Sequence, residues 1–133
     1  MQNQSNIIHA VCPIKFNHCT IPRQEFEKLL NSEEYQYGIS NRTYLVHYGN
    51  PDHSVIPQCN FVCMILKSMK LLDTDELDCE FELVSTPAGR IVKEYIEQGA
   101  DWHISLWGIG IIDQNSKEVS PFIFRGFDFI LDM

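Results

Sequence analysis

The chain has 133 residues, of which 44% are hydrophobic, and a formal net charge of -8. This length corresponds to one domain, and the apolar content is enough for a core that needs neither metal nor disulfide to fold, so we expect a single domain over residues 1–133. The negative charge argues against nucleic-acid binding, because contacts with phosphates draw their affinity from lysine and arginine.

The sequence shows no sign of export or of membrane contact. The first residues, MQNQSN, contain no basic segment followed by an apolar one, so no signal peptide is expected. The longest apolar run, FVCMIL at 61–66, is too short to cross a bilayer. Five cysteines, an odd number spread through apolar runs, favour reduced and buried thiols. We therefore expect a protein that acts in the compartment where it is made.

Six segments have the β-branched, apolar or alternating composition of strands. In chain order they are IIHAVCPIKF (7–16), RTYLVHY (42–48), NFVCMILKSM (60–69), DCEFELV (78–84), WHISLWGIGII (102–112) and PFIFRGFDFIL (121–131). Polar segments at 70–78 and 113–121 have the composition of hairpin loops. Most neighbouring strands are therefore expected to pair antiparallel.

Two helices are expected between these strands. The first begins near Pro22 and runs through RQEFEKLL, and the second lies in STPAGRIVKEYIEQGAD. Thr86 is the expected N-cap of the second helix, and Gly99 can end it in the left-handed conformation. The predicted fold is α+β: a small, mostly antiparallel β-barrel with about two flanking helices.

Ser105 raises the question of nucleophilic catalysis. It lies in the predicted strand two residues after His103 and just ahead of Gly108 and Gly110. A serine becomes a nucleophile only when a base accepts its proton and hydrogen-bond donors stabilise the oxyanion. His103 lies on the same strand face, but it is too far from Ser105, and too nearly parallel to it, for a tight hydrogen bond. The base must therefore come from elsewhere in the fold.

Two other histidines are candidates for this base. His47 ends the segment RTYLVHY, and His53 lies in the irregular segment 49–57 that follows. Asp128 is a carboxylate inside an apolar strand, which costs free energy unless it is paired. Each residue also has a structural interpretation: a serine on a strand is ordinary, His47 suits a hydrogen-bonded strand end, and Asp128 suits a barrel rim that faces water.

A metal site is disfavoured. Cys59 and Cys63, with His47 and His53, are the residues that such a site would use. Their Cys-x-x-x-Cys spacing is not that of a standard zinc site, and burial explains both thiols better. We therefore expect neither a metal nor a cofactor.

The chain resembles the prohead (capsid-maturation) serine proteases of tailed phages, of the myovirus type, which share a fold with the herpesvirus assemblins. The resemblance runs from about residue 10 to residue 131. Its segments are NHCTIPRQEFEKLL (17–30), YLVHYGNPDHSVIP (44–57), STPAGRIVKEYIEQGADWHISLWGIG (85–110) and FRGFDFIL (124–131). It implies an assemblin-type β-barrel, with Ser105 as the nucleophile, His47 or, as second choice, His53 as the base, and Asp128 as the residue that orients the histidine.

Two functions are compatible with this resemblance. A capsid-maturation endopeptidase would cleave scaffold and capsid proteins in the procapsid, inside the host cytoplasm, with backbone N–H groups near Gly108 or Gly110 as the oxyanion hole. Relatives often self-associate, so a homo-oligomer is expected. The family usually has proline directly after its histidine and Ser-Arg-Gly after its nucleophile, where this chain has Tyr48 and Leu106-Trp107-Gly108. These departures suit the alternative, a relative that kept the fold and serves as a structural or auxiliary protein of the virion.

Overall fold

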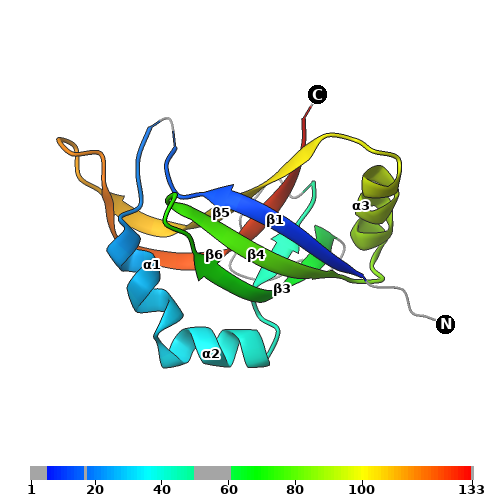
Figure 1. Ribbon diagram of the computed structural model, residues 1–133, viewed down its shortest axis with the longest axis horizontal. Helices are drawn as coiled ribbons and strands as arrows, with labels where there is room; N and C mark the ends of the chain where they lie inside the picture. Colours follow the sequence, from blue (N-terminus) through cyan, green and yellow to red (C-terminus); the bar gives the residue numbers. More distant parts are fainter. Residues whose placement is uncertain (1–5, 17, 50–60, 133) are drawn as a thin grey trace.

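The computed structural model of the protein describes residues 6–16, 18–49 and 61–132. Their helices and strands are, in chain order, β1 (Ile7–Pro13), α1 (Arg23–Leu30), α2 (Glu33–Ser40), β2 (Leu45–His47), β3 (Val62–Leu71), β4 (Glu76–Leu83), α3 (Pro87–Glu97), β5 (Trp102–Ile112) and β6 (Val119–Leu131) (Figure 1). In these residues, no helix has both the length and the apolar character that a membrane crossing needs.

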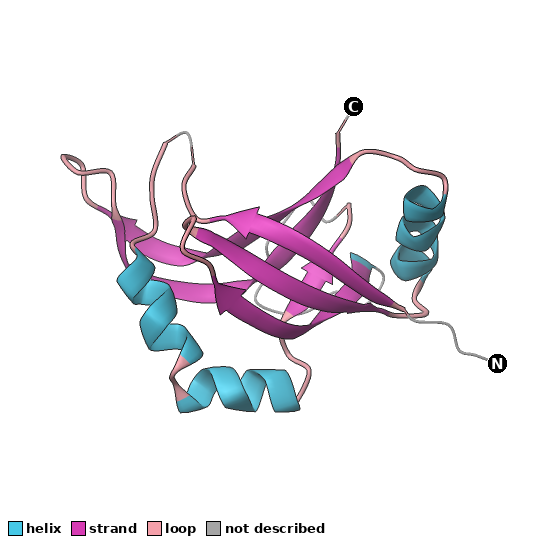
Figure 2. Ribbon diagram, in the orientation of Figure 1, coloured by secondary structure: helices cyan, strands magenta, loops and turns pink. Residues whose placement is uncertain are grey.

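All six strands belong to one sheet in the order β1-β4-β3-β2-β6-β5. Neighbours pair antiparallel, except that β2 and β6 run parallel. The sheet curls into a half-barrel, which brings its two edge strands, β1 and β5, into contact (Figure 2). This is the mostly antiparallel α+β architecture that the sequence predicts.

The core fills the inside of the curled sheet. In β4 the side chains of Leu77, Cys79, Phe81 and Leu83 are buried, and the acidic residues between them face outward, as the alternating sequence predicts. The rings of Phe81 and Phe127 meet edge to face, with 5.1 Å between centroids. Aromatic contacts of this kind join the β3–β4 part of the sheet to β6.

The helices cover the two ends of β3. At one end α1 and α2 contact β3, and at the other end α3 contacts it (Figure 1). The start of α3 is capped as predicted, because the Thr86 hydroxyl accepts the Gly89 N–H at 3.0 Å. Gly99 follows this helix with a φ of +80°, the left-handed conformation expected there.

Helix α2 is not among the sequence predictions. Its N-cap is Ser32, whose hydroxyl accepts the Tyr35 N–H at 3.1 Å. Only Tyr35 and Gly38 of this helix are buried, so the segment lacks the apolar stripe by which helices are found in a sequence. Gly38 lies against the Tyr44 ring, which indicates that tertiary packing, rather than an amphipathic face, holds α2 in place.

A charged contact fixes the start of α1 to the turn between β3 and β4. The Arg23 guanidinium donates to the Asp75 carboxylate at 2.8 Å and to the Leu72 carbonyl at 2.7 Å. Lys15 lies 3.5 Å from the same carboxylate. The β3–β4 turn therefore anchors both α1 and the segment that precedes it.

Candidate functional site

The three predicted site residues lie in one row across the sheet. In the β5–β6 ladder Ser105 pairs with Asp128, and in the β2–β6 ladder His47 pairs with the same Asp128. Residues directly opposite each other in a ladder point to the same face. The structure therefore brings Ser105, Asp128 and His47 together on the face of the sheet opposite the core residues Leu106, Phe127 and Val46.

The spacing of strands sets the distances in this row. Adjacent strands lie about 4.8 Å apart, so the Cα atoms of Ser105 and His47 are about 10 Å apart with Asp128 between them. Asp128, on the middle strand, is next to both.

The side chains of Ser105, Asp128 and His47 differ in how deeply they are buried. His47 is 6% exposed, and the other described histidines, His9, His18 and His103, are exposed. Ser105 and Asp128 are half-buried. Burial of a polar ring costs free energy, so a buried histidine beside a carboxylate and a hydroxyl is typical of a functional site as well as of a polar core contact.

His103 does not face Ser105. Its Nδ1 lies 2.6 Å from the Asp132 carboxylate. In the β5–β6 ladder His103 is opposite Ile130, so Asp132 is on the side of His103 away from Ser105. This agrees with its rejection as the base from sequence. His53, the second-choice base, lies outside the described residues.

Gly108 and Gly110 border a cleft that also includes Ser105. The cleft has a volume of about 370 Å³. It is lined by Phe16, Cys19, Ile21, Ser105, Leu106, Trp107, Gly108, Gly110, Ile112, Val119 and Phe122. None of these side chains carries a charge, and Leu106, Val119 and Phe122 among them lie on the core face of β5 and β6.

The glycine at 108 has a packing role of its own. A Cβ there would lie 2.2 Å from the Ile123 carbonyl oxygen and 2.6 Å from the Phe122 ring. The close approach of β5 and β6 therefore requires glycine, whatever the residue does in catalysis. On the other face, the Trp107 indole lies over Gly126, where an added Cβ would be 3.5 Å from Nε1.

β1 contacts β5 near the start of the cleft, where Cys12 lies close to the Leu106 backbone. Burial raises the pKa of the Cys12 thiol to about 11, and a hydrogen bond from the Leu106 backbone opposes this effect. The β5–β6 register shifts between Trp107 and Gly108 and again between Gly110 and Ile112, so the ladder is irregular on both sides of these glycines.

The described residues contain no group of three or more histidine, cysteine or acidic side chains placed to hold a metal ion. Cys63 is buried, and its thiol contacts the Val46 carbonyl at 3.5 Å. Burial raises its pKa to about 12. Cys59 and His53, the other residues of the disfavoured metal site, lie outside the described ranges.

The sequence analysis did not identify the residues that line the cleft on the side opposite β5. Phe16, Cys19 and Ile21 come from the loop between β1 and α1. The Thr20 N–H donates to Lys117 and the Thr20 carbonyl accepts from Val119, both at 2.9 Å. These backbone bonds hold the loop against the β5–β6 hairpin, and no residue type in the sequence signals them.

Comparison with known proteins gives an informative similarity, and it is structural. No family model matches the sequence. No curated protein matches it either. Among solved structures, the fold is similar to that of the bacteriophage T4 capsid assembly protease, gp21, with a TM-score of 0.75 and 14% sequence identity over 92% of this chain and 79% of that one. The chain thus has an α+β, prohead-protease-like fold, which confirms the fold expectation.

Proposed function

We propose that this chain is a serine endopeptidase of phage head assembly that cleaves scaffold or capsid proteins. The row formed by Ser105, Asp128 and His47 carries the proposal, because three residues far apart in the sequence meet on adjacent strands. The similar fold of a phage capsid assembly protease supports the same function. Procapsids in the host cell would then be the place where the chain acts.

Each residue of the row has a role in this mechanism. The Ser105 hydroxyl attacks the peptide carbonyl, and His47 accepts its proton and returns it to the leaving amine. The Asp128 carboxylate holds the imidazole in one tautomer and stabilises its protonated form. His47 is buried, so its ring is shielded from bulk water during these transfers.

The oxyanion hole is assigned to the edge of β5. Its donors would be the backbone N–H groups of Gly108 and Gly110, which border the same cleft as Ser105. Donors that are fixed in place before the reaction stabilise an oxyanion most effectively.

A second candidate function is a structural or auxiliary protein of the capsid. It is favoured by exposed isoleucines on the outer face of the β5–β6 hairpin, where Ile109, Ile111 and Ile123 are 49%, 66% and 52% exposed. Apolar patches on a surface often mark contacts with other proteins. The residues after Ser105, which differ from the family pattern, favour it too.

A serine-reactive phosphonate probe separates the two functions. One adduct per chain, measured by intact mass, is expected for the wild type and for Ser68→Ala, a control serine on the exposed face of β3. Ser105→Ala should carry no adduct, and His47→Ala should react far more slowly. Both variants should also cleave scaffold protein about 10⁴-fold more slowly or worse.

Other results of the same experiment would contradict the protease. A wild type that carries no adduct, both alone at high concentration and within assembled procapsids, would contradict the protease. Stoichiometric intact chain in purified virions would then favour the structural function.

A further inference from the structure

Trp107 lies on the same face of the sheet as the site row. β5 pairs with β6 without a register shift from Ser105 to Trp107. Residues two apart on a strand share a face, so Trp107 belongs to the outward face that carries Ser105. Its partner in the β5–β6 ladder is Gly126, which pairs in turn with Leu45 of β2. A second row, formed by Trp107, Gly126 and Leu45, therefore runs beside the site row.

The indole of Trp107 reaches over β6. A Cβ at Gly126 would lie 3.5 Å from the indole Nε1, so the indole occupies space where a side chain of β6 would otherwise stand. The close approach of β2 also requires glycine here, since the same Cβ would be 2.6 Å from the Leu45 carbonyl oxygen. Trp107 is half-buried, so part of its surface is accessible to solvent.

The second row is close enough to the site row to contact a bound peptide. Trp107 follows Ser105 by two positions on β5, a separation of about 7 Å between their Cα atoms. A large side chain on the peptide residue at the attacked bond can reach across this distance, whereas the methyl group of an alanine cannot.

Charges of both signs flank the indole and disfavour a charged side chain beside it. Asp128 lies two residues beyond Gly126 on the same face and would repel a carboxylate. Arg125 is the extra residue of a β-bulge on the other side of Gly126. It is exposed, whereas Phe124 before it is buried in the core, so Arg125 also lies on the outward face and would repel a cation.

We propose that Trp107 is a specificity-determining residue of the substrate site, and that its indole packs against an aromatic side chain of the peptide next to the bond that Ser105 attacks. Two rings that pack together gain more than the area they bury provides, whereas an aliphatic chain gains only the area. The inference rests on the proposed function for the cleavage step. The binding step has its own readout, because the fluorescence of Trp107 reports contact without cleavage.

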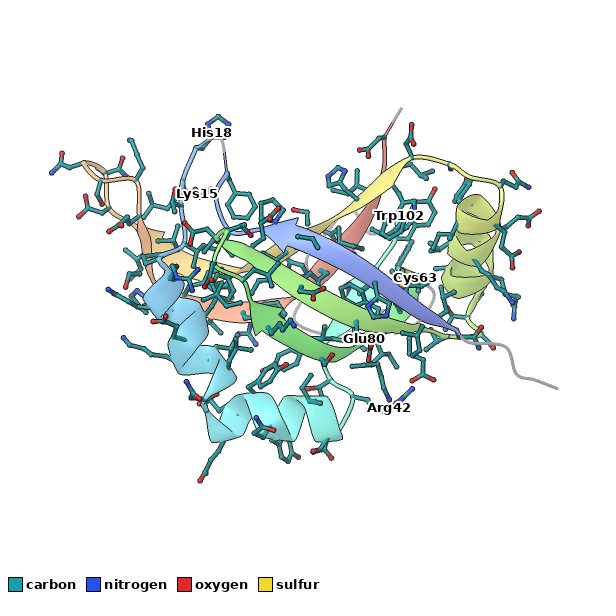
Figure 3. The ribbon with its side chains drawn as sticks, in the orientation of Figure 1. Lys15, His18, Arg42, Cys63, Glu80 and Trp102 are labelled. Carbon is teal, nitrogen blue, oxygen red and sulfur yellow. The ribbon has the colours of Figure 1, made fainter. Side chains whose placement is uncertain are left out.

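The binding experiment makes Trp107 the only tryptophan. The chain has one other, Trp102, which stacks on Phe129 with 5.2 Å between ring centroids, on the core face and at the α3 end of β5 (Figure 3). A chain with Ser105→Ala and Trp102→Phe therefore neither cleaves a peptide nor emits from a second indole. Quenching of its fluorescence by acrylamide is measured with capped alanine peptides that carry one central Phe, Leu, Lys or Glu.

A bound ring that covers the indole should keep acrylamide away from it. We expect the Phe peptide to bind, by this measure of protection, about fivefold or more tightly than the Leu, Lys and Glu peptides. Equal protection by all four peptides, or protection by none of them at millimolar concentration, would overturn the proposal.

His103 supplies the matched control position. It is exposed on the same strand face, two residues from Ser105 on the side away from Trp107. In a chain that combines His103→Trp with Ser105→Ala, Trp102→Phe and Trp107→Phe, the four peptides should protect the new indole equally. Selective protection by the Phe peptide at this position too would overturn the proposal, because it would indicate general adhesion of aromatic groups to the outward face.

Labelling of Ser105 gives a second test, which depends on the proposed function. A phosphonate with a benzyl group next to phosphorus should label the wild type about fivefold or more faster than one with a methyl group. Trp107→Ala should abolish this preference and Trp107→Phe should keep most of it, whereas Ile130→Ala, an exposed change on the same face, should leave it unchanged. Selective protection of Trp107 without any labelling would support its role in binding and contradict the protease. Labelling without a preference for the benzyl group would support the protease and contradict the role of Trp107.

Discussion

Asp128 lies between Ser105 and His47 on the central strand of the site row. If its carboxylate orients the imidazole, Asp128→Asn should lower kcat about 10²–10⁴-fold and leave KM nearly unchanged, because the wrong tautomer is then favoured. Combining it with His47→Ala should cost little more than His47→Ala alone, since the two residues act as a unit. Cleavage of a capsid or scaffold substrate by the purified variants measures both effects.

Asp78→Asn is the control for this change. Asp78 is a half-buried carboxylate on the outward face of β4, far from the row. The Asp78→Asn variant should retain full activity. A loss of activity in both variants, or additive losses in the double variant, would contradict the role of Asp128.

Gly89 shows how a single residue limits the packing of a helix. A Cβ at this position would lie 1.8 Å from the Val84 carbonyl oxygen, which is backbone and cannot rotate away. Gly89→Ala should therefore lower the free energy of unfolding by about 1–3 kcal/mol or more, as overpacking does. Urea unfolding measures the loss. Lys93→Ala, an exposed change on the same helix, should stay within about 0.5 kcal/mol of the wild type.

At the scale of elements, the contact between α1 and the β3–β4 turn makes stability depend on pH. The hydrogen bond from Arg23 holds the pKa of Asp75 below its usual value of 3.8, and Lys15 adds to this effect. A lowered folded-state pKa gives stability that is present above the unfolded pKa and is lost as the pH falls through the folded one. The contact should therefore stabilise the protein at neutral pH and fade below about pH 4.

Asp75→Asn tests this dependence. Asparagine keeps the shape and tolerates the φ of +61° found at this position. The variant should be less stable than the wild type at pH 7, and the difference should shrink as the pH is lowered below the normal range of an aspartate. Urea midpoints at several pH values measure it. Asp101→Asn, at an exposed carboxylate before β5, is the control and should show no such convergence.

Elements with a strong local signal could be predicted from the sequence. The alternation in 78–84 gives β4, and Thr86, Pro87 and Gly99 give the ends of α3. Helix α2 could not be found in this way, since its place depends on packing of Gly38 against Tyr44. The parallel pairing of β2 with β6 could not be predicted from the sequence either. β2 has only three residues, and its alternation of side chains is too short to specify which strands lie beside it.

The candidate site likewise has features that the sequence could predict and features that it could not. Ser105, His47 and Asp128 were selected as candidates from their residue types and from the family resemblance, but their alignment in one row follows from the β2–β6 pairing. The apolar wall formed by Phe16 and Cys19 depends on backbone bonds between a loop and a distant hairpin. Such contacts leave no periodic signal in the sequence.

At the scale of the whole molecule, two properties act against each other in self-association. The net charge of -8 makes copies of the chain repel, whereas the exposed isoleucines of the β5–β6 hairpin favour contact. Salt screens the repulsion and leaves the apolar contact intact. We therefore expect association that strengthens with ionic strength.

Sedimentation at increasing protein and salt concentrations measures this association. Ile111→Lys should weaken it, because a charge then interrupts the apolar strip on the hairpin. Ile91→Lys is the matched control, an exposed isoleucine on α3 at the other end of the molecule. Equal weakening by both changes would indicate a general charge effect and contradict an interface at the hairpin.

The central place of β6 would also affect when the proposed activity arises. β6 follows the other five strands of the sheet in sequence, yet it separates β5 from β2 and is the ladder partner of both. Ser105 and His47 are thus already synthesised while the strand that aligns them is still missing, and long-range pairings of this kind form late in folding. A nascent chain that lacks β6 would hold the proposed nucleophile and base but no assembled site, so the proposed proteolysis would be coupled in time to completion of the fold.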